Sequence, residues 1–168
     1  YTLRLTVTDQ AGLSSESRLK LILDNQQAGA ELMAPSQDQY VKDQIAIIGT
    51  ANDQNFKSYR LELGVGHNPA SWKVLTQSST IRQAEGLYNW DTTGLEGQYS
   101  LKLIVEDFTN DQVVVQRQIT VDNTPPQAQI TVPEAEAIVS GNLQIVGTAS
   151  DDYFDSYLLQ QAEGANPA

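Results

Sequence analysis

Apolar and polar residues alternate with a period of two along most of this chain. Tyr99, Leu101, Leu103 and Val105 occupy every second position of one run, and the same spacing recurs between residues 59 and 63. An extended strand places successive side chains on opposite faces, so this spacing predicts strands with one side in a core and the other toward solvent. No stretch has the 3.6-residue spacing of a long amphipathic helix. The chain is therefore expected to be all-β.

The pattern repeats after 98 residues without a gap. Residues 1–70 share 23 identities with residues 99–168, against roughly four expected by chance, which indicates a tandem duplication. We therefore expect a complete Ig-like repeat at residues 26–123. It would be preceded by the C-terminal part of another repeat (1–25) and followed by the N-terminal part of a third (124–168). Because the chain opens inside a strand-like run, we expect it to be a window on a longer protein.

About seven strands fit within the complete repeat, separated by turn signals such as Asn52-Asp53 and Asn110-Asp111. They are expected near residues 30–34, 43–51, 57–64, 71–76, 87–91, 98–107 and 112–122. Seven short strands in a domain of about 100 residues are typical of an immunoglobulin-like (fibronectin-III-like) β-sandwich. Tyr99, and Tyr1 one repeat earlier, begin the sixth strand after a turn. This position predicts either a tyrosine corner or plain core packing.

Two longer motifs resemble a known group. Residues 86–95 read Gly-Leu-Tyr-Asn-Trp-Asp-Thr-Thr-Gly-Leu, and the repeat ends Val-Asp-Asn-Thr-Pro-Pro at residues 121–126. These motifs resemble the tandem Ig-like repeats of bacterial envelope and secreted proteins. They are similar to the Ig-like domain of the flagellar hook-capping protein and to repeats appended to envelope transglycosylases. The resemblance implies the sandwich fold and an extracellular, cell-surface location. It implies little about function, because such modules serve as spacers, adhesins and enzyme appendages alike.

The two linkers differ in their proline content. Pro125 and Pro126 follow the complete repeat, whereas the linker before it reads Asp-Asn-Gln-Gln-Ala at residues 24–28. Successive prolines favour an extended, stiff chain, so the second linker is expected to be the stiffer one.

Composition excludes several function classes. The chain has 10 basic and 21 acidic residues, a net charge of −11 and no cysteine. Phosphate contacts need clustered Lys and Arg, so no nucleic-acid partner is expected. No apolar stretch is long enough to insert this segment into a membrane. The single histidine, His67, lies in an expected turn, and its counterpart in the next repeat is Ala165. No catalytic motif is present, and the chain is expected to be no enzyme.

Acidic residues gather at the expected turns and linkers. The chain should enter an Ig-like sandwich at one pole and leave at the other, with two of the turns beside the incoming linker. Ca²⁺ takes six to eight oxygens, several of them from carboxylates, so these residues are candidate ligands. One group is Asp24, Asn25, Asp53, Asp107 and Asp111, and the other is Asp122, Asn123, Asp151 and Asp152. The alternative is that each forms a turn by bonding its own backbone. No other cofactor is expected.

The two tryptophans, Trp72 and Trp90, lie in the part of the repeat that both end segments lack. Exposed together they could stack on a sugar ring. The alternative is that one or both belong to the sandwich core.

Taken together, these patterns predict a non-enzymatic structural segment of an extracellular bacterial surface protein: a stalk, spacer or filament of Ig-like repeats. The alternative is a glycan- or protein-binding accessory module of a cell-envelope enzyme. The expected partners are the neighbouring repeats of the same chain, with a glycan or a surface protein as further candidates. Strand addition at a domain edge would give a homo-oligomer or fibre.

Overall fold

The structure is a computed structural model that describes residues 1–164, and every regular element in it is a β-strand. The strands are β1 (Thr2–Thr8), β2 (Ser14–Lys20), β3 (Gly29–Ala34), β4 (Gln39–Val41), β5 (Gln44–Asn52), β6 (Phe56–Val65), β7 (Lys73–Ser78), β8 (Arg82–Asp91), β9 (Gly97–Asp107), β10 (Gln112–Val121), β11 (Gln127–Val132) and β12 (Val146–Ser150). The described part of the chain contains no helix long and apolar enough to cross a membrane. The all-β prediction is confirmed.

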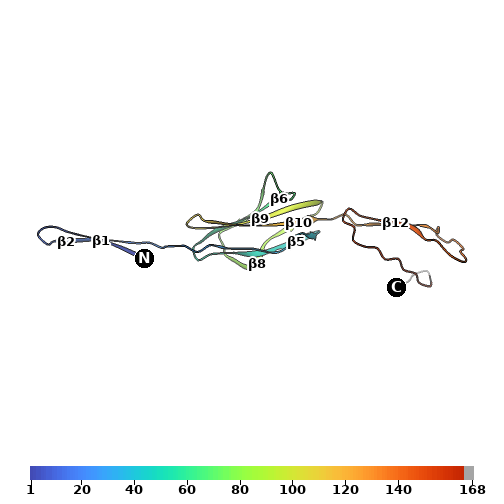
Figure 1. The fold of residues 1–168 in the computed structure, drawn as a ribbon, viewed down its shortest axis with the longest axis horizontal. Coiled ribbons are helices and arrows are strands. Elements are labelled where there is room, and N and C mark those ends of the chain that lie inside the picture. The colour runs from blue at the N-terminus through green and yellow to red at the C-terminus, as the bar shows by residue number, and fades with distance from the viewer. Residues whose placement is uncertain (165–168) are drawn as a thin grey trace.

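Strands β3 to β10 form two facing sheets in the middle of the molecule (Figure 1). One sheet has the order β4-β10-β9-β6-β7, and the other has the order β3-β5-β8. Strand β9 lies at the centre of the larger sheet, where Leu103 stands opposite Leu61 of β6 and Val115 of β10. This is the immunoglobulin-like, fibronectin-III-like β-sandwich that the alternation predicts.

The core lies between the sheets and is built by the alternating positions. Leu101, Leu103 and Val105 of β9 are completely buried, as are Leu61 of β6 and Ile47 of β5. Burying each such side chain contributes about 1.5–3 kcal/mol relative to leaving it exposed. The period-two pattern therefore determines both the strands and the face that each one buries.

One strand was not expected. β4 pairs in parallel with β10, with Val41 opposite Val121. The backbone N–H of Asp38 donates to the carbonyl of Gln118 (2.8 Å), and that of Asp122 donates to the carbonyl of Val41 (3.0 Å). The chain thus leaves the three-stranded sheet after β3 and joins the five-stranded sheet. The complete sandwich has eight strands rather than the predicted seven, because three residues are too few to show an alternation.

The end segments lie on opposite sides of the sandwich (Figure 1). β1 and β2 form an antiparallel hairpin, and β11 pairs with β12. Both reproduce local details of the sandwich 98 residues away. A bulge interrupts the β3–β5 pairing between Leu32 and Ala34, and another interrupts the β11–β12 pairing between Ile130 and Val132. The end segments therefore adopt the local geometry of the repeat.

Candidate functional site at the repeat junctions

The first junction is the place where residues 21–28 reach the sandwich, and several of the predicted acidic residues meet there. Asp24 of the linker, Asp53 of the β5–β6 turn and Asp107 at the end of β9 each place a carboxylate oxygen within 4.8 Å of the others. Asn25 and Asp111 line a shallow hollow beside Asp24. The structure thus brings together the residues that the sequence assigns to this junction.

Each of these three carboxylates, which we call the junction carboxylates, also forms a turn. Oδ1 of Asp24 accepts the N–H of Gln26 (3.0 Å), and Oδ1 of Asp53 accepts the N–H of Asn55 (2.6 Å). Asp107 is almost fully buried, and its Oδ1 accepts the N–H and the hydroxyl of Thr109, both at 2.7 Å, and the N–H of Asp111 at 3.1 Å. These bonds, above all that from the Thr109 hydroxyl, lower the pKa of Asp107 below its ordinary value, although burial acts in the opposite direction. The hydrogen bonds of the turn therefore favour the ionised form of Asp107.

The β1–β2 hairpin provides a comparison for Asp107. Asp9, its counterpart one repeat earlier, accepts the backbone N–H groups of Ala11 and Leu13, both at 2.9 Å. Among the described residues, no group of three acidic side chains forms around Asp9. Turn formation alone therefore explains an aspartate at this position. If Ca²⁺ bound at the first junction, Asp24, Asp53 and Asp107 would hold it, with the remaining oxygens drawn from backbone or water.

Asn55 connects the incoming linker to the sandwich. Its side-chain amide donates to Oδ2 of Asp24 (2.7 Å), and its backbone carbonyl accepts the N–H of Phe108 (2.9 Å). Asn55 therefore joins the linker and both turns. The sequence analysis missed it because its counterpart in the next repeat is Tyr153, so the internal repeat does not mark the position.

The second junction, where residues 122–126 leave the sandwich, is held differently. The Nδ2 group of Asn123 donates to the carbonyls of Thr92 (2.8 Å) and Leu95 (2.9 Å), and its Oδ1 accepts the N–H of Asp43 (2.9 Å). We call this arrangement the Asn123 clasp. Both the nitrogen and the oxygen of the side-chain amide form hydrogen bonds with the backbone of the sandwich, so Asn123 binds the sandwich rather than a metal.

The other candidates at the second junction do not gather as those at the first do. Within residues 1–164, Asp122, Asp151 and Asp152 form no carboxylate group of the kind found at the first junction. Oδ1 of Asp122 accepts the N–H of Thr124 (3.2 Å), and Oδ1 of Asp151 accepts the N–H of Tyr153 (2.8 Å). Both residues act in local turns.

An aromatic contact lies at the second junction instead. The ring of Tyr153 packs edge-on against that of Tyr40 in β4, with centroids 5.3 Å apart. Burial, followed by the negative charges of Glu96 and Asp122, raises the pKa of the Tyr153 hydroxyl. The ring therefore stays neutral and apolar at physiological pH. Pro125 and Pro126 of the adjoining linker are exposed.

The aromatic residues serve the sandwich. Trp90 is buried in the core and packs edge-on against Tyr99, with centroids 5.5 Å apart. Among the described residues, no hydrogen bond from the Tyr99 hydroxyl to the backbone is found, so Tyr99 is a core residue rather than a corner. Tyr1, its counterpart in β1, is exposed.

Trp72 is half-buried on the outer face of the five-stranded sheet. The Lys102 ammonium lies 4.0 Å from the centre of its ring. A Cβ atom added to Gly64 would come within 3.2 Å of the ring. Trp72 therefore already packs on its neighbours, which leaves less of the ring for a sugar. His67 is exposed in the β6–β7 loop.

No protein-family model and no curated protein sequence matches this chain. Among solved structures, the chain is similar to an endo-β-1,4-mannanase from Thermotoga petrophila. The identity is 14% over 60% of this chain and 21% of that one, and the TM-score is 0.45. It is also similar to fibronectin(III)-like modules of Clostridium thermocellum CbhA, with 17% identity over 55% of this chain and 93% of that one and a TM-score of 0.37.

The chain spans about a fifth of the length of the mannanase. The class of protein rests on the strand order described above, which is that of an immunoglobulin-like, fibronectin-III-like sandwich.

Proposed function

We propose that this chain is a non-enzymatic structural segment of an extracellular bacterial surface protein, a stalk or spacer built from Ig-like repeats. On this proposal, residues 26–123 are the complete repeat, and residues 1–25 and 124–168 belong to its two neighbours. The observation that carries the proposal is the course of the chain. It enters the sandwich at one end and leaves at the opposite end, with the end segments continuing outward (Figure 1).

The junctions support a rod rather than a flexible string of domains. At the first junction, the hydrogen bond from Asn55 to Asp24 fixes the linker to the sandwich. At the second, the contact between Tyr153 and Tyr40 adds apolar packing beyond the Asn123 clasp. Since relative domain motion is the default where few contacts cross a boundary, these contacts would limit bending.

The chemistry of the described residues also supports a structural role. Catalysis by acid and base needs two titratable groups with suitable pKa values that face a common cavity. Here the junction carboxylates accept hydrogen bonds from their own turns, and the lone histidine is exposed in a loop. The carboxylates therefore stabilise turns of the repeat, and the histidine is a loop residue.

Small-angle X-ray scattering tests the proposal. A compact globule of 168 residues would have a radius of gyration of about 15 Å. A rod made of a hairpin, a sandwich and a third segment in line would be about 100 Å long, and its radius of gyration would be about 30 Å. We expect the larger value for the dilute protein. A value near that of the globule would refute the rod.

A junction variant makes the test sharper. Tyr153→Ala removes the contact with Tyr40, so we expect a broader distribution of interatomic distances at the second junction. Tyr88→Ala is the matched control, because Tyr88 lies in β8 of the sandwich and takes no part in the Tyr40–Tyr153 contact. If both variants scatter as the parent does, the aromatic contact does not stiffen the chain.

A further inference from the structure

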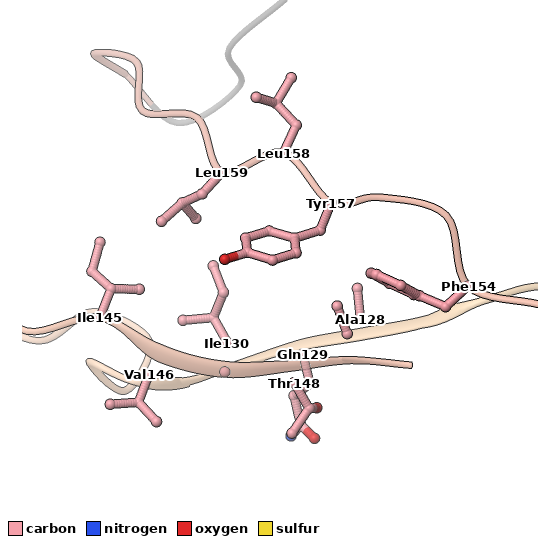
Figure 2. A pocket seen from close by; sticks show the side chains of 12 residues that line it. Ala128, Gln129, Ile130, Ile145, Val146, Thr148, Phe154, Tyr157, Leu158 and Leu159 are labelled. Atoms are coloured by element: carbon pink, nitrogen blue, oxygen red, sulfur yellow. The ribbon is translucent and has the colours of Figure 1, made fainter. Parts of the chain in front are cut away.

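One hollow lies on the segment after the second junction. Figure 2 shows its apolar side chains on one side of the β11–β12 pair: Ile130, Ile145, Phe154, Tyr157 and Leu159. Their counterparts 98 residues earlier are buried in the core of the sandwich: Leu32, Ile47, Phe56, Tyr59 and Leu61. The hollow is therefore the inner face of a repeat rather than a docking site, whereas the sandwich itself has an open strand edge.

This open edge belongs to the five-stranded sheet. β4 pairs with β10 only at residues 119–121. Residues 112–117 of β10 pair with β9 on one side and have no strand on the other. The side chains of Gln112, Val114 and Gln116 are exposed there. An uncovered strand edge is a template for another strand, because its backbone groups lack partners.

The outward backbone groups of this edge belong to the even-numbered residues. Gln118 shows this, since its carbonyl accepts the N–H of Asp38 (2.8 Å) and its own N–H donates to Oε1 of Gln37 (3.1 Å), both on the β4 side. In an antiparallel pair, successive residues direct their N–H and C=O groups to opposite sides. Residues 112, 114 and 116 therefore direct theirs away from β9, and among the described residues these groups have no hydrogen-bond partner.

The other edges of the sandwich are protected against pairing. Register shifts interrupt the pairing of β8 with β5 twice and that of β7 with β6 once. On β3, a register shift follows Leu32, whose carbonyl accepts a hydrogen bond from the Arg117 guanidinium. Such irregularities twist an edge away from a new strand, and a carbonyl that is already bonded is less available to one. In contrast, β10 pairs with β9 without a shift, so its free edge is regular.

The sequence along the open edge is the same in both directions. Residues 112–116 read Gln-Val-Val-Val-Gln, and Asp111 and Arg117 flank them. When two such strands run antiparallel about Val114, glutamine stands opposite glutamine and valine opposite valine. Asp111 of each copy then stands opposite Arg117 of the other. Opposite charges in cross-strand pairs stabilise a sheet, so the edge is complementary to a second copy of itself.

This register also satisfies the backbone. It pairs Val114 with Val114 and residue 112 with residue 116, which are the residues whose N–H and C=O groups point outward, and each such pair exchanges two hydrogen bonds. Asp111 and Arg117 form a non-hydrogen-bonded pair, in which side chains lie closer together. In the described part of the chain, the buried Nε of Arg117 has no hydrogen-bond partner. The carboxylate from a second copy thus approaches a guanidinium that has an unused donor.

We propose that two copies of this chain pair side by side through β10, antiparallel and centred on Val114. The two five-stranded sheets then form one continuous sheet across a twofold axis. Because both copies use the same surface, the pair closes on itself and adds no third copy. The contact spans only residues 111–117 of each copy, below the roughly 1,200 Å² at which stable interfaces begin, so association is reversible. The pairing is independent of the proposed spacer function, which a single molecule can perform.

Sedimentation velocity of the full 168-residue chain tests the proposal. In about 0.15 M salt, repulsion between two chains of net charge −11 is screened beyond about 8 Å. Between about 10 µM and about 1 mM we expect a monomer that converts to a dimer and to nothing larger. Val114→Lys places two ammonium groups at the centre of the contact, so it should weaken dimerisation by about tenfold or more. Val74→Lys is the matched control and should dimerise like the parent, because Val74 is equally exposed (49% against 50%) and lies in β7 at the opposite edge of the same sheet.

A mixture of two charge variants tests the register. Val114→Lys and Val114→Glu should each dimerise poorly, because the twofold axis sets like charges opposite each other. Mixed in equal amounts, they should form a dimer with one copy of each, since the opposed charges then attract. Fluorescence of Trp72 and Trp90 checks that the central sandwich is folded in every sample.

Several outcomes would overturn the pairing. One is a parent that stays monomeric or grows beyond a dimer. Another is a Val114→Lys protein that dimerises like the parent, or a Val74→Lys protein that is impaired to the same extent. The register is wrong if the mixture dimerises no better than either variant alone.

Discussion

The side-chain amide of Asn123 holds three parts of the sandwich together, and its removal should be costly. Its three hydrogen bonds reach the backbone of Asp43, Thr92 and Leu95. A hydrogen bond of this kind contributes about 1 kcal/mol net, so Asn123→Ala should lower the free energy of unfolding by about 3 kcal/mol. This is a large fraction of the roughly 5–15 kcal/mol that stabilises a typical domain.

Urea denaturation followed by tryptophan fluorescence measures this loss. Both tryptophans lie in the central sandwich, so the signal reports that unit. With a urea dependence of about 1–3 kcal/mol per molar, a loss of about 3 kcal/mol lowers the midpoint by about 1–3 M. Asn25→Ala is the control, because Asn25 occupies the same repeat position and is exposed. We expect its midpoint to stay within experimental error of the parent.

Asn123→Asp separates the clasp from a role in calcium binding. An aspartate keeps an oxygen for the N–H of Asp43 but cannot donate to the carbonyls of Thr92 and Leu95, so it should destabilise the sandwich as alanine does. A calcium ligand would tolerate the change, because carboxylates serve Ca²⁺ well. The clasp is refuted if Asn123→Ala leaves the midpoint unchanged, or if Asn25→Ala lowers it equally.

Three further perturbations test other parts of the structure. Gly49→Ala would place a Cβ 2.3 Å from the carbonyl oxygen of Glu31 in β3, so it should lower the free energy of unfolding by about 1–3 kcal/mol. Gly86→Ala is the control, because its Cβ meets no atom within 4 Å, and it should lower the free energy of unfolding by less than half as much. Urea denaturation compares the two variants. Burial opposes ionisation of Glu62, but hydrogen bonds from Lys102 and Arg60 (both 2.6 Å) outweigh it and lower the pKa of Glu62 below 4.5. Its contribution to stability is thus present above pH 4.5 and disappears as the pH falls through the lowered value. Glu62→Gln should flatten the acid limb of a stability–pH curve, and an unchanged limb contradicts this. The calcium hypothesis predicts that Ca²⁺ raises the melting temperature and that EDTA reverses the rise, whereas an unchanged temperature leaves the junction carboxylates with their turn role alone.

Alternation was sufficient to predict most of the fold. Every second residue of β9 from Tyr99 to Val105 is apolar and buried, so the sequence identifies the strand and its inner face together. β8 begins at Arg82, five residues before its predicted start, because residues 83–86 lie exposed at a sheet edge and carry no alternation. β4 was missed for a related reason, since its three residues are held by pairing with β10 rather than by a pattern of their own.

The junctions were only partly predictable. The repeat marked Asp24, Asp53 and Asp107, because each lies in a turn or linker whose position follows from the strand order. Asn55 and the Tyr40–Tyr153 contact were not predicted, since each depends on how two distant segments approach in space. The corresponding residues also differ between repeats, so that no internal comparison could reveal them.

The parallel pairing of β4 with β10 has a mechanical consequence. Both strands run from the end where the chain enters to the end where it leaves. Tension applied at the two ends therefore pulls these strands in opposite directions along their own axes. The hydrogen bonds of Asp38 to Gln118 and of Asp122 to Val41 lie across this direction, so they are loaded in shear at the same time. β4 can leave β10 only when these hydrogen bonds break together, so the smallest strand of the sandwich resists stretching in addition to the β3–β5 pairing.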